Sequence, residues 1–405
     1  MTLDVRRLRG EFPLFAGATE PLHYLDNAAT AQIHRSALDA VIRHETTARA
    51  NVQRGTYPLA TAASAAYEAA RADVARFFNA FSPQEVVFTS GATEAINLVA
   101  HAFGATLRAG DEVMITAAEH HSNFVPWQQL RDRAGIVLKV LPVTEEGRID
   151  VAALERCVTA RCRLIAVTHV SNVTGAVTDV AVIVAAARAV GARVLLDGAQ
   201  AVQHGLVDVQ SLGVDFYAFS GHKCFGPGGV GVLWGRADVL AAMPPFMAGG
   251  GMVGQVTESA TAFAEAPRRF EAGTPPIAQA VGLAAALRWM GGLDWGAIRE
   301  RESRLAGRLL DGLATFPDAA IVGPEALNQR LPIVAFTLQG LHPHDVAQVL
   351  GDRGVAVRGG HHCAQPLMAA LGIDGATRAS IALYNDESDV DALLEGIGAA
   401  RRILR

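Results

Sequence analysis

Two side chains with reactive groups stand in unusual surroundings. Lys223 lies in FSGHKCFGPGG, between an apolar run and a glycine-rich loop, where a solvated surface amine is out of place. Such surroundings lower the pKa of an amine and favour the neutral nucleophile that forms a Schiff base. Cys363 lies in VRGGHHCAQP, expected to be an exposed loop, with Arg358, His361 and His362 nearby to favour the reactive thiolate. From these residues alone, a turn lysine and a small buried cysteine stay open as alternatives.

A carboxylate and a set of hydroxyls suggest a flat, phosphorylated cofactor. Asp197 ends the apolar run RVLLD, at the edge where open α/β sheets bind ligands. A protonated pyridine nitrogen would pair with this carboxylate and act as an electron sink, and Gln200 is close enough to reach a ring hydroxyl. Thr93 opens a helix in SGATEAIN, where a phosphate can bind, and Ser220 and His222 flank the lysine. An N-cap aspartate and an ordinary capped turn remain the alternatives.

Two histidines and an arginine complete the candidate set. His120 and His121 follow an apolar run in AAEHHSN, and either ring could stack on a flat cofactor at the same sheet edge. Arg378, which opens the run RASIALY, could form a fork-like clamp on a carboxylate, with a surface ion pair as the alternative. Cys157 and Cys162 lack matching histidines, so no metal site is expected.

The elements that must position these side chains alternate between apolar, β-branched runs and helix-like segments. Runs that are apolar on both faces suit a sheet covered on both sides, and intervening helices predict parallel crossovers. After about residue 290, helix-like stretches alternate with PIVAFTLQG, GVAVRGG and RASIALY, which predicts a second, smaller α/β domain. Residues 247–256 and the EAGTPP stretch are expected to be loops. The seven runs of the first part are 85–89, 111–116, 137–143, 163–170, 193–199, 215–221 and 229–235.

Composition limits the class of protein. The chain has 405 residues, 50% hydrophobic and 19% charged, which is enough for more than one core. A formal net charge of -5 favours neither nucleic acid nor an acidic membrane surface. Four cysteines without paired spacing indicate a reducing compartment, and the first residues show no apolar run of signal-peptide length. We therefore expect a soluble, cytoplasmic protein that binds neither nucleic acid nor membrane.

On these motifs the chain resembles the class V aminotransferase-like enzymes that use pyridoxal 5'-phosphate, and within them the SUF-type (group II) cysteine desulfurases and selenocysteine lyases. The similarity runs from YLDNAAT (24–30) to RASIALYN (378–385), with SGHK and DGAQ specific for the superfamily and HHCAQP for the desulfurase branch. The resemblance implies an α/β fold of fold type I. It further implies an N-terminal segment (1–20) packing on the small domain, a large domain (21–290) with a mainly parallel seven-stranded sheet between helices, and a small C-terminal α/β domain (291–405) carrying the cysteine loop.

The resemblance also implies a role for each candidate residue. Lys223 forms the Schiff base with the cofactor, Cys363 accepts sulfur, and His120 stacks on the ring and moves protons. The remaining cofactor-binding residues are Asp197, Gln200, Ala92, Thr93, Ser220, His222 and Thr274, the last reaching the phosphate from the partner subunit of a homodimer. The substrate-binding residues are Asn172, Arg358, Arg378 and Ala28.

The implied activity is conversion of L-cysteine to L-alanine, with sulfur passing to an enzyme persulfide and on to a small acceptor protein for iron–sulfur or other thio-cofactor assembly. L-Selenocysteine is a second expected substrate. The alternatives are another class V reaction, namely an aminotransferase, epimerase or kynureninase-like hydrolase, and a non-catalytic scaffold. The chain departs from the family pattern at Gln53, Tyr57 and Cys224, which leaves substrate preference and partner coupling open.

Overall fold

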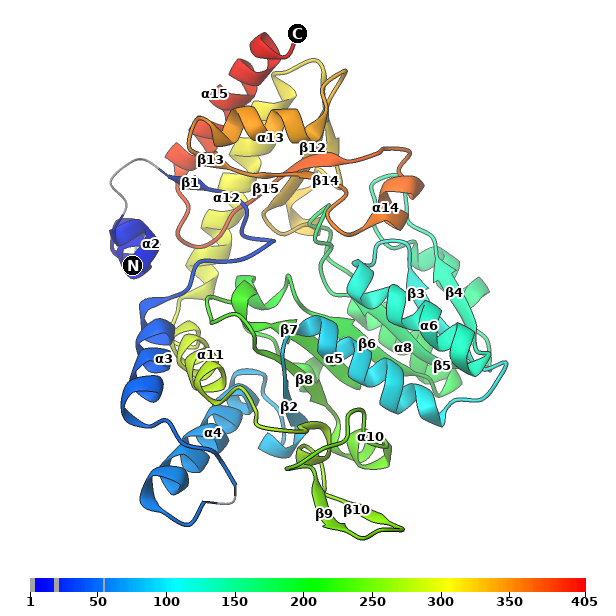
Figure 1. Cartoon of the computed structure of the whole chain (residues 1–405). Coiled ribbons are helices and arrows are strands. Elements are labelled where there is room, and N and C mark those ends of the chain that lie inside the picture. The colour runs from blue at the N-terminus through cyan, green and yellow to red at the C-terminus, as the bar shows by residue number, and fades with distance from the viewer. Residues whose placement is uncertain (1–3, 18–21, 54) are drawn as a thin grey trace.

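The computed structural model describes residues 4–17, 22–53 and 55–405, and its largest element is a seven-stranded sheet (Figure 1). The strand order is β2-β8-β7-β6-β5-β3-β4. β8 runs antiparallel to both of its neighbours, and all other pairs are parallel. The predicted mainly parallel sheet is confirmed. Its strands are β2 (Val86–Thr89), β3 (Glu112–Thr116), β4 (Val137–Leu141), β5 (Cys162–Thr168), β6 (Arg193–Asp197), β7 (Phe216–Ser220) and β8 (Gly231–Gly235).

Both faces of this sheet are covered because its strands are apolar on both sides. In β7, Tyr217 and Phe219 face one hydrophobic cluster, while Phe216 and Ala218 face the other. The first cluster is completed by α4 (Pro58–Phe77), α8 (Val180–Val190) and α11 (Ile277–Met290). The second is completed by α5 (Ala92–Leu98), α6 (Val125–Ala134) and α10 (Ala237–Ala242). Helix α3 (Arg35–Thr47) packs on α11. The same part of the chain also contains two short helices, α7 (Leu154–Cys157) and α9 (Val209–Leu212).

A second, four-stranded antiparallel sheet forms from the C-terminal part of the chain, at the end of the molecule where α15 lies (Figure 1). Its order is β11-β12-β15-β14, from β11 (Ala319–Val322), β12 (Ile333–Leu338), β15 (Ala376–Ser380) and β14 (Arg358–Gly360). A separate hydrophobic cluster joins it to α12 (Trp295–Ala314), α13 (Pro343–Gly351) and α15 (Glu387–Ile403). The predicted smaller α/β unit is therefore present, with β11 as a strand that the sequence patterns did not single out.

The N-terminal helices α1 (Val5–Gly10) and α2 (Pro13–Ala16) contact both parts of the molecule. Arg9 pairs with Asp389 at the start of α15, at 2.9 Å. Between the helices, Phe12 is fully buried and packs edge-on against Phe225 and Tyr384. The segment was expected to pack on the small domain, and it also packs on the seven-stranded part through Phe225. A short parallel pair, β1 (His23–Tyr24) and β13 (Val355–Ala356), follows it.

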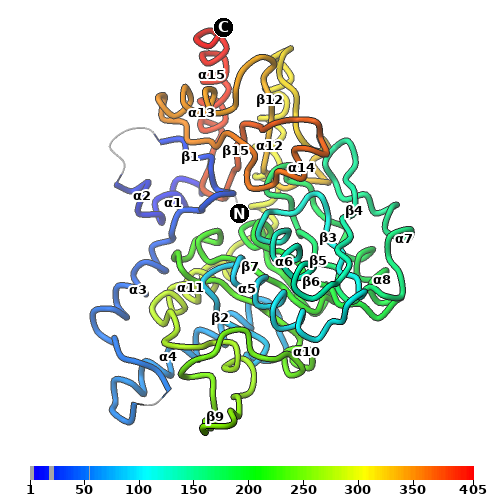
Figure 2. The backbone as a smooth tube through the Cα atoms, turned by 45° about the vertical axis from the view of Figure 1, so that its right-hand side comes forward, coloured from blue at the N-terminus to red at the C-terminus, as the bar shows by residue number. Residues whose placement is uncertain are grey.

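The expectation of a loop over 247–256 is wrong for its last residues. β9 (Val253–Val256) pairs antiparallel with β10 (Thr261–Phe263), and this exposed hairpin lies at the end of the molecule opposite α15 (Figures 1 and 2). The glycines before it obscured a short strand whose partner follows only a few residues later. Across the residues that the structure describes, no helix combines the length and apolar character needed to cross a bilayer.

Candidate active site

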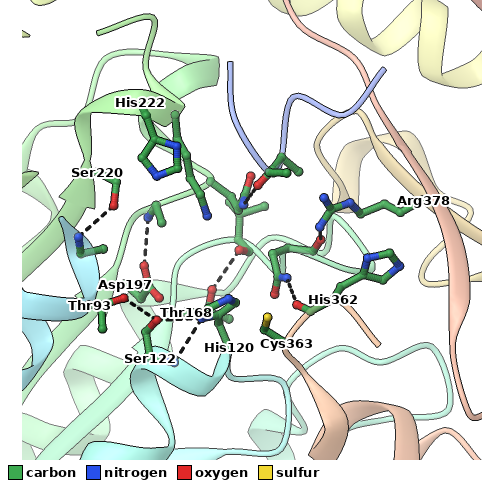
Figure 3. A pocket seen from close by; sticks show the side chains of 18 of the residues that line it. Thr93, His120, Ser122, Thr168, Asp197, Ser220, His222, His362, Cys363 and Arg378 are labelled. Carbon is green, nitrogen blue, oxygen red and sulfur yellow. Dashed lines mark hydrogen bonds between the residues drawn. The ribbon is translucent and has the colours of Figure 1, made fainter. Parts of the chain in front are cut away.

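A cavity of about 230 Å³ lies at the carboxyl ends of β3, β5, β6 and β7 (Figure 3). Parallel strands place their ends at one edge, so residues that are far apart in sequence meet there. Every predicted site residue except Thr274 lines this cavity: Ala28, Ala92, Thr93, His120, Asn172, Asp197, Gln200, Ser220, His222, Lys223, Arg358, Cys363 and Arg378. Thr274 is exposed and lines a different cavity with residues of α3 and α11, so this chain alone does not test its expected role on a partner's phosphate.

The titratable groups that line the cavity at these strand ends are tuned by burial. Burial lowers the pKa of the Lys223 amine to about 8, although the Asp197 carboxylate acts in the opposite direction. Burial also raises the pKa of Asp197, whose carboxylate accepts a hydrogen bond from the Ala199 N–H at 3.0 Å. The pKa of His120 falls to about 3, first through burial and then through the charge of Lys223. The site therefore offers a readily deprotonated amine and a neutral imidazole at pH 7.

Hydroxyls and backbone N–H groups gather where α5 begins. The Ala92 N–H donates to Ser220 Oγ at 2.8 Å, and Thr93 Oγ1 lies 2.8 Å from Ser122 Oγ. On the other side, Thr30 Oγ1 lies 3.0 Å from Nδ1 of His222. Helix N-terminal N–H groups with several hydroxyls are a suitable environment for a phosphate.

Arg378 is the buried cation of the site, with a side chain 2% exposed. Its Nη1 donates to the Asn172 carbonyl at 2.8 Å and its Nη2 to Asp26 Oδ1 at 2.9 Å. Its Nε has no hydrogen-bond partner in the described part of the chain. Each outer nitrogen of the predicted fork-like clamp thus already makes one hydrogen bond, which leaves Nε, the second N–H of each outer nitrogen and the net charge for a substrate carboxylate.

Residues 24–30 connect the two sheets at the cavity. The Ala28 N–H donates to Ser380 Oγ of β15 at 2.8 Å, and the Ala28 carbonyl accepts from Gln200 Nε2 at 2.8 Å. The neighbouring Asn27 donates to the Ser380 carbonyl at 2.6 Å. This segment, defined here as the bridging loop, forms one wall of the cavity and contacts the elements on both sides of it.

Cys363 enters the cavity from the other sheet, on a turn between β14 and α14 (Gln365–Ala370). It is half-buried, and its sulfur faces the pocket (Figure 3). His362 and Cys363 both have left-handed backbones, with φ of 52° and 56°. Asn172 Nδ2 holds this turn by donating to the His362 carbonyl at 2.8 Å.

The structure also settles which residues line the cavity where the sequence left the choice open. His120 lines it and His121 does not. Ser122 and Thr168 line it too, and the sequence reasoning assigned them no role. Ser122 stands in the EHHSN motif, where its hydroxyl lies 2.9 Å from His120 Nδ1, so the motif itself was the available signal.

Cys224 is buried beside the lysine, and burial raises the pKa of its thiol, which is therefore inert. Within 4–17, 22–53 and 55–405, no group of three or more His, Cys, Asp or Glu side chains is placed to hold a metal ion.

Comparison with known proteins decides the family. The family described as Aminotransferase class-V matches residues 23–393. The chain belongs to the class V aminotransferase family. A cysteine desulfurase of Pectobacterium carotovorum is 44% identical over 411 residues, which covers 100% of both chains. A probable cysteine desulfurase of Streptomyces coelicolor is 43% identical, over 98% of this chain and 97% of the relative.

Solved structures agree with this class V assignment. The cysteine desulfurase CsdA from Escherichia coli has a TM-score of 0.92 at 38% identity, with 100% of both chains covered. The apo cysteine desulfurase of Thermococcus onnurineus has a TM-score of 0.94 at 36% identity, covering 100% of this chain and 99% of that one. The expected fold type I is confirmed.

Class V enzymes use pyridoxal 5'-phosphate, and the cavity fits this group. The Gln200 Oε1 atom is buried at the cavity without a hydrogen-bond partner among the described residues, as expected of an acceptor that faces a ring hydroxyl. Among the described residues, no cation bonds directly to the buried Asp197 carboxylate, and the ring nitrogen would supply one. Lys223 would hold the aldehyde carbon, and Thr93, Ser220 and His222 the phosphate.

Proposed function

We propose that this chain is a cysteine desulfurase, which converts L-cysteine to L-alanine and takes the sulfur onto Cys363 as a persulfide. The observation that carries the proposal is one cavity lined by Lys223, Asp197 and the Cys363 thiol. The names of full-length relatives at 43–44% identity support it. A thiol is required because sulfur must pass to a soft nucleophile separate from the lysine.

Each of these residues has its own role in the proposed reaction. When bound, the cofactor withdraws electrons from the substrate's Cα, which weakens the bond between Cβ and sulfur. The Lys223 amine takes the Cα proton. The Asp197 carboxylate would stabilise the positive charge on the ring nitrogen of the cofactor. Arg378 attracts the substrate carboxylate, and Cys363 Sγ attacks the substrate's sulfur. The substrate's C–S bond breaks as the S–S bond to Cys363 forms, and Cβ gains a proton to give alanine.

Other class V reactions are the second candidate. An aminotransferase, an epimerase or a kynureninase-like hydrolase needs the lysine and the aspartate but not a thiol in the same cavity. The cysteine turn is the feature that favours desulfuration over these three. L-Selenocysteine is a further proposed substrate, since selenium leaves more readily than sulfur.

The proposal also includes the oligomeric state, the partner protein, the cellular location and the domain limits. Exposed Thr274 and the exposed β9–β10 hairpin support a homodimer in which each subunit completes the other's phosphate site. A small acceptor protein would collect the persulfide sulfur. All four cysteines, each within the described residues, are free thiols, which supports a cytoplasmic enzyme. We retain the divisions 1–20, 21–290 and 291–405 as proposed domain limits.

The variant Cys363→Ser tests the function. We expect it to bind the cofactor with normal absorbance and to bind L-cysteine, because the residues at the strand ends are unchanged. Its release of alanine and sulfide from L-cysteine should fall at least ~100-fold, since a hydroxyl cannot accept sulfur. Turnover of L-cysteine at the rate of the unchanged enzyme would refute the proposal. L-Selenocysteine serves as the internal control, because its turnover is expected to survive in the same variant.

A further inference from the structure

The turn that carries Cys363 is held against an unfavourable backbone conformation. Its two left-handed residues, His362 and Cys363, each carry a side chain, and this conformation favours glycine. Helix α14 begins directly after the turn, and its N-cap residue Ala364 has no side-chain acceptor for the first free N–H groups. Within the turn, the Cys363 N–H donates to His361 Nδ1 at 3.1 Å, and contacts from outside the turn add to this bond.

His121 supplies such contacts from the edge of the seven-stranded sheet. Its backbone N–H donates to the Cys363 carbonyl at 2.8 Å. Its ring Nε2 accepts a hydrogen bond from the Gln365 N–H, with 3.3 Å between the two nitrogens. The imidazole therefore acts as the side-chain cap that Ala364 cannot provide at the start of α14. His121 thus contacts the turn at Cys363 itself and again two residues later at Gln365, while the adjacent His120 lines the cavity.

We propose that His121 is a positioning residue which, through the acceptor Nε2 of its ring, holds the Cys363 turn in the conformation that faces the cavity. The inference rests on the proposed function of Cys363 and extends it to a residue that does not line the cavity. Burial, followed by the neighbouring His361, keeps the pKa of His121 below its usual value, which agrees with a neutral ring that has a free lone pair. Substituting the side chain leaves the backbone contact intact, so the ring can be tested alone.

Amide hydrogen exchange of the holoenzyme tests the contact directly. In His121→Ala, the Gln365 amide should exchange about fivefold faster, because it loses an acceptor worth one ordinary hydrogen bond. His121→Gln should restore slow exchange, since Gln Oε1 reaches nearly as far as Nε2, whereas His121→Asn is too short and should resemble alanine. If His121→Ala fails to fold, the comparison of Gln365 exchange between His121→Gln and His121→Asn still tests the hydrogen bond.

Kinetics separate positioning from a general structural role. We expect kcat for alanine formation to fall about fivefold in His121→Ala and His121→Asn, with KM for L-cysteine unchanged and kcat recovered in His121→Gln. His101→Ala, at an exposed histidine in the π-helical segment Val99–Phe103 that follows α5, is the matched control and should change neither the Gln365 exchange rate nor kcat. Unchanged Gln365 exchange in both short variants, or no recovery with glutamine, would overturn the proposal. Failure of the cysteine desulfurase proposal would instead be seen as full L-cysteine turnover in Cys363→Ser.

Discussion

The two ends of the cavity are built in opposite ways. Lys223 and Asp197 lie at the ends of buried, hydrogen-bonded strands in the middle of the seven-stranded sheet. Cys363 lies on a turn from the other sheet, with two consecutive left-handed residues and contacts from only a few side chains. The difference indicates that the end with Lys223 and Asp197 is rigid and shaped by the fold, while the end with the proposed sulfur acceptor is a strained segment that neighbouring residues hold in place.

At the rigid end, the largest effect should come from the Asp197 carboxylate. Asp197→Asn removes the charge that, under the proposed function, keeps the ring nitrogen protonated, and such a pairing is worth about 1–3 pKa units. We therefore expect alanine formation to fall roughly 100-fold while the fold and cofactor content persist. Assays of turnover and absorbance measure this, with Asp132→Asn, in an exposed ion pair with Arg131, as the control. A fall of less than threefold would mean that the buried carboxylate does not tune the cofactor.

A pH experiment measures how strongly the rigid end is tuned. Since the pKa of Lys223 is lowered to about 8, its reactive neutral form dominates above that pH and falls about tenfold per unit below it. After removal of the cofactor, capture of pyridoxal 5'-phosphate should follow this profile, with its midpoint near pH 8. The rate can be followed by the absorbance of the lysine-linked cofactor between pH 6 and 11. A midpoint at pH 10 or higher would show that burial does not lower the pKa of the Lys223 amine.

The smallest expected effect is a difference in folding stability at the strained end. At the φ of 56° of Cys363, glycine avoids the clash that any other residue meets, so Cys363→Gly should be about 1 kcal/mol more stable than Cys363→Ala. Urea unfolding of the two variants measures this difference. At the exposed helical position 62 in α4, Ala62→Gly should show the opposite sign, with a loss of about 1 kcal/mol. Equal stability of the two Cys363 variants would indicate that the turn is unstrained.

The sequence predicted the rigid end well because its signals are local. Each of the seven apolar runs became a strand, and Asp197 and Ser220 stand at strand ends as their motifs indicated. Parallel strands then bring these ends together, so a linear pattern sufficed to gather the residues. The grouping of Lys223 with Cys363 came from the resemblance of the motifs to a family.

The remaining features depend on contacts between distant segments. Nothing in the sequence around Arg378 shows that Asp26 and the Asn172 carbonyl each accept a hydrogen bond from one of its outer nitrogens. Likewise, the choice between His120 and His121 depends on which ring the turn at the end of β3 directs into the cavity. The short strand β9 was missed because glycines precede it and because its partner, rather than its own pattern, defines it.

The bridging loop has a consequence for exchanging parts among relatives. Since Ala28 bonds to Ser380 on one side and to Gln200 on the other, residues 24–30 belong to neither sheet alone. A chimera that takes residues 291–405 from another desulfurase would need the matching bridging loop from the same parent, although that loop ends more than 250 residues earlier in the sequence. Crossover points chosen by linear order alone would split a single structural unit.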